Sequence, residues 1–170
     1  ESENSDFCTM KIDSLGNIKW ISQYNGPENL RDEAYNLDID NEGNIYVAGM
    51  SVIREVGEDW AIRLIKYDSL GQQRWVRTYA NPNGDYKLGS MNIKEDSIYV
   101  IGTTKPATFD TLFYITMIKY DTSGNQVWVK NYKDTGEQAY NYGYGVEFDN
   151  RGNMYVFGIC GTNNDNVFLI

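Results

Sequence analysis

The sequence predicts an all-β fold assembled from a repeated unit of four short antiparallel strands. Composition is the first indication: 41% of the 170 residues are hydrophobic and 14% are aromatic, with 14 tyrosines. Aromatic and β-branched side chains suit the pleated, half-buried surface of a sheet. The second indication is a segment that occurs three times, as MKIDSLGNIKW, IKYDSLGQQRW and IKYDTSGNQVW, at Met10–Trp20, Ile65–Trp75 and Ile118–Trp128.

A second repeated segment alternates with the first. It reads IDNEGNIYVAG, IKEDSIYVIG and FDNRGNMYVFG, at Ile39–Gly49, Ile93–Gly102 and Phe148–Gly158. Its middle copy is one residue shorter and lacks the Gly-Asn pair, so its turn must be built differently. Both segments recur every 53 to 56 residues, and such a period indicates one structural unit stacked on its neighbours.

The first repeated segment predicts a strand, a turn and a second strand. The strand RLIKYD is apolar on both sides, as in a sheet covered on two faces. In the turn, an aspartate can accept hydrogen bonds from backbone amides and a glycine allows positive φ; these residues are Asp13, Asp68 and Asp121 with Gly16, Gly71 and Gly124. The following strand carries Trp-x-x-x-Tyr, which places both rings on one face.

The polar connections that follow lead into a third predicted strand. In the first connection Leu30, Ala34 and Leu37 have helical spacing, but the equivalent segments contain glycines at 84, 89, 136 and 143, which disfavour a helix. We therefore expect strands that end at Ile39, Ile93 and Phe148, and the IYV segment supplies a fourth. Four short strands in about 54 residues predict one blade of a β-propeller.

Charge excludes several classes of partner. The formal net charge is −9 with no histidine and no cluster of basic residues. A negative surface repels nucleic acid and anionic membranes, so neither is an expected partner. No apolar run approaches the roughly 20 residues of a membrane span, and the polar opening ESENSD is not a signal peptide. The lack of histidine removes the usual general base and the commonest zinc ligand.

The two cysteines, Cys8 and Cys160, are separated by almost the whole chain and have no metal-ligand spacing. Both lie in apolar strand-like segments, which favours buried free thiols. A disulfide between them is the alternative, and neither interpretation identifies a cellular compartment.

The repeated residues resemble the SBBP family of β-propeller repeats from secreted and surface proteins of bacteria. Asp59–Tyr79 and Leu37–Gly49 follow the family pattern closely. The resemblance implies that the strand through Leu37 is innermost, followed by the IYV strand, RLIKYD and the Trp strand. It implies an extracellular or bacterial cell-surface location. It also implies a non-catalytic module that binds protein or carbohydrate, or serves in structural display.

Two other functions are alternatives to this one. One is a propeller-type lyase or glycosidase with its site at the channel mouth, and the other is an intracellular scaffold. No catalytic residue or resident cofactor is expected.

The strand pattern divides the single propeller segment 1–170 into a partial blade 6–24, blades 34–79 and 87–132, and a partial blade 142–170. Three blade-equivalents cannot close a ring of the usual four to eight. We expect the segment to be part of a larger protein, with further blades of the same protein as neighbours. The alternative is that two copies complete each other's split blades in a six-bladed ring.

The loops entering the innermost strands are where we expect a ligand, because these loops differ between repeats. Aromatic and polar side chains there could stack on a sugar or a peptide and hydrogen-bond it. The predicted ligand-binding residues are Asp32, Tyr35, Tyr86, Tyr140, Tyr142 and Tyr144, with Asp85 and Asn141 nearby. The alternative, which we favour for the tyrosines, is packing between blades.

A weaker candidate is a calcium site. Asp38, Asp40 and Glu42 begin a sequence that resembles a calcium loop. Glu42 is long for a third ligand, and Gly49 stands where a bidentate glutamate would be needed. We favour a hairpin turn. Adjacent carboxylates such as Asp32 and Glu33, or Glu58 and Asp59, are interpreted as solvated charge.

Overall fold

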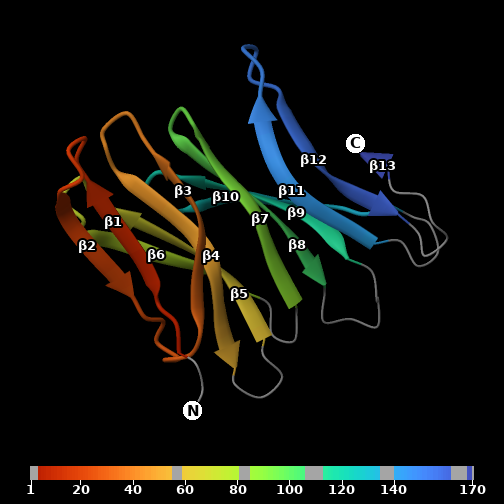
Figure 1. The fold of residues 1–170 in the computed structure, drawn as a ribbon. Helices are drawn as coiled ribbons and strands as arrows, with labels where there is room; N and C mark the ends of the chain where they lie inside the picture. Colours follow the sequence, from red (N-terminus) through yellow and green to blue (C-terminus); the bar gives the residue numbers. More distant parts are fainter. Residues whose placement is uncertain are drawn as a thin grey trace.

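The computed structural model describes residues 4–54, 59–80, 85–105, 113–134, 140–161 and 168–169, and all regular structure in them is β-strand (Figure 1). The strands are β1 (Phe7–Ile12), β2 (Ile18–Tyr24), β3 (Asp32–Ile39), β4 (Ile45–Arg54), β5 (Asp59–Tyr67), β6 (Gln73–Tyr79), β7 (Asp85–Lys94), β8 (Ser97–Lys105), β9 (Tyr114–Asp121), β10 (Gln126–Tyr132), β11 (Tyr140–Phe148), β12 (Met154–Gly161) and β13 (Phe168–Leu169).

The strands form four antiparallel sheets that follow one another along the chain. Blade A contains β1 and β2, blade B contains β3 to β6, blade C contains β7 to β10, and blade D contains β11 to β13. Within each sheet the strands lie in sequence order, and the sheets form an open fan in Figure 1. The prediction of an all-β fold with four-stranded antiparallel blades is confirmed. The first strands begin at Asp32, Asp85 and Tyr140, two residues before the predicted blade starts.

The repeated Asp and Gly residues shape one end of the fan, here called the turn end. In the β5–β6 turn, Asp68 Oδ1 accepts hydrogen bonds from the backbone N–H groups of Leu70 and Gln72, both at 2.9 Å. Gly71 has φ of 80°, a conformation that L-residues with a Cβ disfavour. The β7–β8 hairpin, which lacks the glycine, instead places Glu95 at φ of 54°. The prediction that this turn is built differently is therefore confirmed.

The core lies between blades, in layers that each combine residues of two sheets. Tyr46 and Ala48 of blade B share a buried cluster with Met91 and Ile98 of blade C. Further layers join blade A to blade B and blade C to blade D. Each central sheet is therefore buried on both faces, which is why its strands are apolar on both sides.

The repeated lysine and tryptophan connect neighbouring blades at the turn end. Trp75 Nε1 and Lys66 Nζ donate to the Thr122 carbonyl at 3.3 and 3.2 Å. One blade earlier, Trp20 Nε1 and Lys11 Nζ donate to the Ser69 carbonyl at 3.2 and 3.4 Å. We call this arrangement the Lys–Trp clamp, and it explains why the lysine before the aspartate recurs together with the tryptophan.

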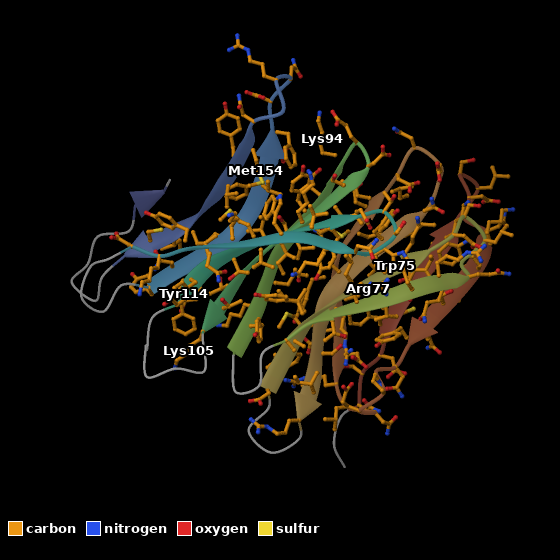
Figure 2. All side chains as sticks on the ribbon, turned by 180° about the vertical axis from the view of Figure 1, so that it is seen from behind. Trp75, Arg77, Lys94, Lys105, Tyr114 and Met154 are labelled. Carbon is orange, nitrogen blue, oxygen red and sulfur yellow. The ribbon has the colours of Figure 1, made fainter. Side chains whose placement is uncertain are left out.

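The outer strand of blade B adds a second contact to the same neighbouring turn. Trp75 and Arg77 lie side by side on β6 in Figure 2, and Arg77 Nε donates to the Gly124 carbonyl at 2.6 Å. The same view shows Lys94 and Met154 towards the turn end and Lys105 and Tyr114 towards the opposite end. The opposite end is called here the loop end.

One prediction about the cysteines is wrong. Both thiols are free, and Cys160 is buried, but Cys8 is exposed. Along β1, Phe7 and Thr9 face the core and Cys8 alternates to the other side. That side faces away from blade B, and no sheet of the described chain covers it.

Candidate functional site

A groove at the loop end separates blades B and C, and we call it the B–C groove. Its volume is about 420 Å³. β3, β5 and β7 begin at this end, and their first residues meet across the two blades. The lining residues are Glu33, Tyr35, Met50, Trp60, Tyr86, Lys87 and Leu88. The groove therefore brings together two of the predicted residues, Tyr35 and Tyr86.

Tyr35 presents its ring to solvent in the groove. Its side chain is 59% exposed, and its hydroxyl donates a hydrogen bond to the Glu33 carboxylate. Partial burial and this hydrogen bond raise the pKa of the phenol to about 12, so it stays protonated near neutral pH. Tyr35 lies where the β3–β4 register shifts between Ala34 and Asn36, which makes it the extra residue of a β-bulge.

The corresponding bulges in the other blades do not form the same surface. In β7 the bulge residue is Gly89, and a Cβ there would lie 2.2 Å from the Gly143 carbonyl oxygen. Only glycine fits, because the β11 backbone passes so close. In β11 the bulge residue is Tyr144, which is 46% exposed. Tyr35 and Tyr144 are thus equivalent in the repeat, but only Tyr35 lines the groove.

Tyr86 and Trp60 form the less accessible part of the groove. Tyr86 is 4% exposed and packs edge-on against Tyr79 with ring centroids 5.6 Å apart. The Arg31 guanidinium lies 4.6 Å from the Trp60 ring centroid and its Nε is 3.4 Å from Glu33 Oε1. The packing of Tyr86 between blades agrees with the interpretation that we favoured for the tyrosines.

Tyr140 and Tyr142 belong to a neighbouring aromatic cluster between blades C and D. The Tyr142 ring centroid is 5.8 Å from that of Tyr140 and 5.3 Å from that of Phe113. Lys87 Nζ lies 5.7 Å from the Tyr142 centroid. Lys87 also lines the B–C groove, so it connects the groove to this cluster.

Two of the polar candidates are committed to the fold. Asp32 is 2% exposed and its Oδ2 accepts a hydrogen bond from the Gly26 N–H at 2.7 Å. Asn141 is fully buried, and its Nδ2 donates to the Phe113 carbonyl at 2.9 Å. Both side chains hold connecting segments in place and lie outside the groove. The side chain of Asp85 lies outside the described residues.

The three calcium candidates are occupied by hydrogen bonds of the fold. Asp38 Oδ2 accepts from the Ile93 N–H at 2.8 Å, between blades B and C. Asp40 Oδ1 accepts from the Asn44 and Glu42 N–H groups at 2.8 and 3.0 Å, and Glu42 Oε2 accepts from Asn44 Nδ2 at 3.3 Å. Partial burial raises the pKa of Asp40, but the hydrogen bonds from Asn44 and Tyr46 outweigh it and hold the pKa below its usual value. These bonds agree with the hairpin-turn interpretation.

Among the residues that the structure describes, no three His, Cys, Asp or Glu side chains could hold a metal ion together. No helix in the described part of the chain could cross a membrane.

Sequence reasoning missed Trp60 and Lys87 as groove residues and interpreted Glu33 as solvated charge. A signal was present in the antiparallel strand order. β3, β5 and β7 all start at the loop end, so residues near their starts must gather there. Trp60 is the second residue of β5 and Lys87 the third of β7. The contact across blades depends on the β3 bulge, which the sequence does not reveal.

Part of the chain matches a known family of repeats. A family model described as a beta-propeller repeat, SBBP, matches residues 19–51. These residues span the Trp strand of blade A and the first two strands of blade B. The match confirms the resemblance found in the repeated segments. No curated protein matches the chain.

Proposed function

Because the chain carries an SBBP β-propeller repeat at residues 19–51, we propose that it is a non-catalytic binding module whose B–C groove holds a carbohydrate chain. The observation that carries the proposal is the composition of the groove. The exposed ring of Tyr35 and the carboxylate of Glu33 meet there in a cavity of about 420 Å³, with Lys87 also in its lining. That volume lies in the range of roughly 300–1,000 Å³ usual for ligand sites.

Carbohydrate is favoured by the chemistry of the lining residues. The apolar C–H face of a sugar ring stacks on an aromatic ring, and the exposed ring of Tyr35 offers such a surface. Sugar hydroxyls donate hydrogen bonds, and the Glu33 carboxylate in the groove can accept them. The hydrogen bond between Tyr35 and Glu33 holds the ring in place before a ligand arrives, which reduces the entropy lost on binding.

Binding of the chain to arrays of immobilised polysaccharides and of synthetic peptides tests this proposal. We expect retention on a polysaccharide and at least tenfold weaker binding by Tyr35→Ala. The matched control is Tyr132→Ala, which removes a tyrosine that is 45% exposed on the outer strand β10 and should leave binding unchanged.

Other outcomes separate the alternatives. Retention only on peptides, lost in Tyr35→Ala, would assign the groove to a protein ligand. New reducing ends or unsaturated products from a bound polysaccharide would support a glycosidase or lyase. Equal binding by wild type and Tyr35→Ala would refute the groove as the site.

The proposal includes an extracellular or bacterial cell-surface location, which is supported by the resemblance to the SBBP family. Digestion of intact producing cells with an added protease tests it. Loss of the full-length chain before lysis is the expected result. Protection until the cells are broken would favour the intracellular scaffold.

A further inference from the structure

The same position of the repeat is buried in two blades and exposed in the first. Met91 in β7 and Val146 in β11 are 5% and 3% exposed, and each faces the preceding blade. Leu37 in β3 occupies the equivalent position and is 48% exposed. It lines an apolar groove of about 380 Å³ between β3 and β1, together with Ile39, Met10 and Ile12. Leu37 is exposed because blade A has no inner strands among the described residues.

The face of the repeat that packs on the following blade shows the same contrast in blade D, the last blade of the fan. Ala48 in β4 and Ile101 in β8 are fully buried, and each faces the following blade. Their equivalent in β12 is Phe157, which is 46% exposed. Tyr155 is 58% exposed, whereas its equivalent Tyr46 is fully buried. The chain thus carries two uncovered apolar faces of different type, one on β3 and one on β12.

The two interfaces inside the chain show that these faces belong together. Tyr46 and Ala48 pack in one cluster with Met91 and Ile93. In the next interface Tyr99 contacts Phe148 with ring centroids 4.7 Å apart, in a cluster with Ile101 and Val146. The β12 face and the β3 face therefore correspond to the two sides of an interface of this kind.

The sheet edges match in the same way. In blades B and C the second strand pairs with the third, as in the register Met50 to Ile62 and Ile45 to Tyr67. β1 is the third strand of blade A and pairs with β2 alone within the described chain. β12 is a second strand, and among the described residues its outer edge pairs with β13 at Ile159 and Cys160. Unpaired edges of this kind are templates for another strand.

The clamp at the turn end supplies a third match. Lys66 and Trp75 of blade B donate to the Thr122 carbonyl in blade C. Their equivalents in blade C are Lys119 and Trp128. The equivalent of Thr122 in blade A is Ser14, after the first repeated aspartate.

We propose that a second copy of this chain covers the open faces. Its β12 pairs along β1, so that its Phe157 packs on Leu37 and its Tyr155 on Ile39. Its blade A in turn completes blade D of the first copy, which brings the Ser14 carbonyl to the first copy's Trp128. In blade B the second strand pairs with the third from Ile45 to Met50. With the same register, β1 would pair with the partner's Met154 to Ile159. Of these residues, β13 also pairs with Ile159. Two copies joined in this way form six blades, within the usual range of four to eight.

Light scattering of the purified chain tests the proposal. We expect twice the chain mass of 19.5 kDa for the wild type. Leu37→Glu and Phe157→Lys should each give single chains, because each places a charge in the interface that the partner does not neutralise. Both positions are about half exposed in one copy, so circular dichroism should show native β-structure. The control is Val127→Glu, which alters a 55% exposed residue of the outer strand and should remain dimeric.

Mixing the two monomeric variants decides the pairing. In a ring that contains one chain of each variant, one interface would bring the two substituted positions together with opposite charges. The other interface would be wild type, so the mixture should recover the dimer. A wild-type monomer over a wide range of concentration would overturn the proposal. A dimer that persists in Leu37→Glu and Phe157→Lys would overturn it equally. Tyr35→Ala should leave assembly unchanged, because Tyr35 lines the B–C groove and not the β3–β1 groove, so this test is independent of carbohydrate binding.

Discussion

Replacing Gly71 by alanine should destabilise the chain much more than replacing Gly16, although both glycines occupy the same position of the same turn. Gly71 has φ of 80° and Gly16 has φ of 87°, so an alanine at either position costs about 1–2 kcal/mol of backbone strain. At Gly16 a new Cβ meets no atom within 4 Å. At Gly71 it would lie 2.6 Å from Cδ2 of the Trp20 ring.

The additional cost at Gly71 follows from what Trp20 must give up. Real Cβ atoms do not approach within 3.0 Å of a ring atom, so the indole has to move. Movement breaks the hydrogen bond from Trp20 Nε1 to the Ser69 carbonyl, which contributes about 0.5–1.5 kcal/mol. It also removes part of the ring's packing against the core between blades A and B, worth roughly 1 kcal/mol. We expect a total of about 2.5–4.5 kcal/mol for Gly71→Ala.

Urea unfolding followed by circular dichroism, at concentrations where the chain is monomeric, measures both variants. Trp20→Leu in the Gly71→Ala background should recover part of the loss, because the smaller side chain leaves room for the Cβ. Equal losses for the two glycine variants, or strict additivity with Trp20→Leu, would refute the reasoning.

Two further predictions concern burial and charge. In the monomer, Met91→Ala should lower the free energy of unfolding by about 2–4 kcal/mol and Leu37→Ala by less than about 1 kcal/mol. The reason is that Met91 is buried and its removal leaves a cavity, whereas Leu37 is half exposed. Equal midpoints of urea unfolding for the two variants would contradict this. The hydrogen bond from Lys19, with those from Asn17, lowers the pKa of Asp13 from 3.8 to about 2. A lowered native pKa stabilises the fold above pH 4 and that stability is lost as pH falls towards 2. NMR titration should show a higher Asp13 pKa in Lys19→Met, and an unchanged value there would contradict the assignment.

The repeated frame could be predicted from the sequence because its signals occur at fixed offsets. Asp68 and Gly71 mark a turn locally, and their recurrence in register makes the interpretation much stronger than any single copy would. The same comparison correctly excluded a helix at Leu37, where local spacing alone suggested one.

The candidate site was less predictable because it depends on which way individual side chains point. Asp32 is a polar residue in a loop-like segment, yet it is buried and binds the Gly26 amide. Tyr35 enters the groove through a β-bulge, and a one-residue change of register cannot be read from an alternating pattern. Cys8 was placed on the wrong side for a related reason: its exposure depends on what lies beside β1.

The Lys–Trp clamp has a direction, and this bears on how the chain unfolds. Each clamp donates from one blade to the turn of the next, as Trp20 does to Ser69 and Trp75 does to Thr122. In a single chain the blades thus depend only on their immediate neighbours, and opening should begin at the ends and move inward. In the monomeric Leu37→Glu variant, amide hydrogen exchange should therefore be slowest in β4 and β8, which have packed sheets on both sides, and fastest in the strands of blades A and D. The repeat would act as a row of linked units that open at different rates according to their position, although they share the same repeated segments.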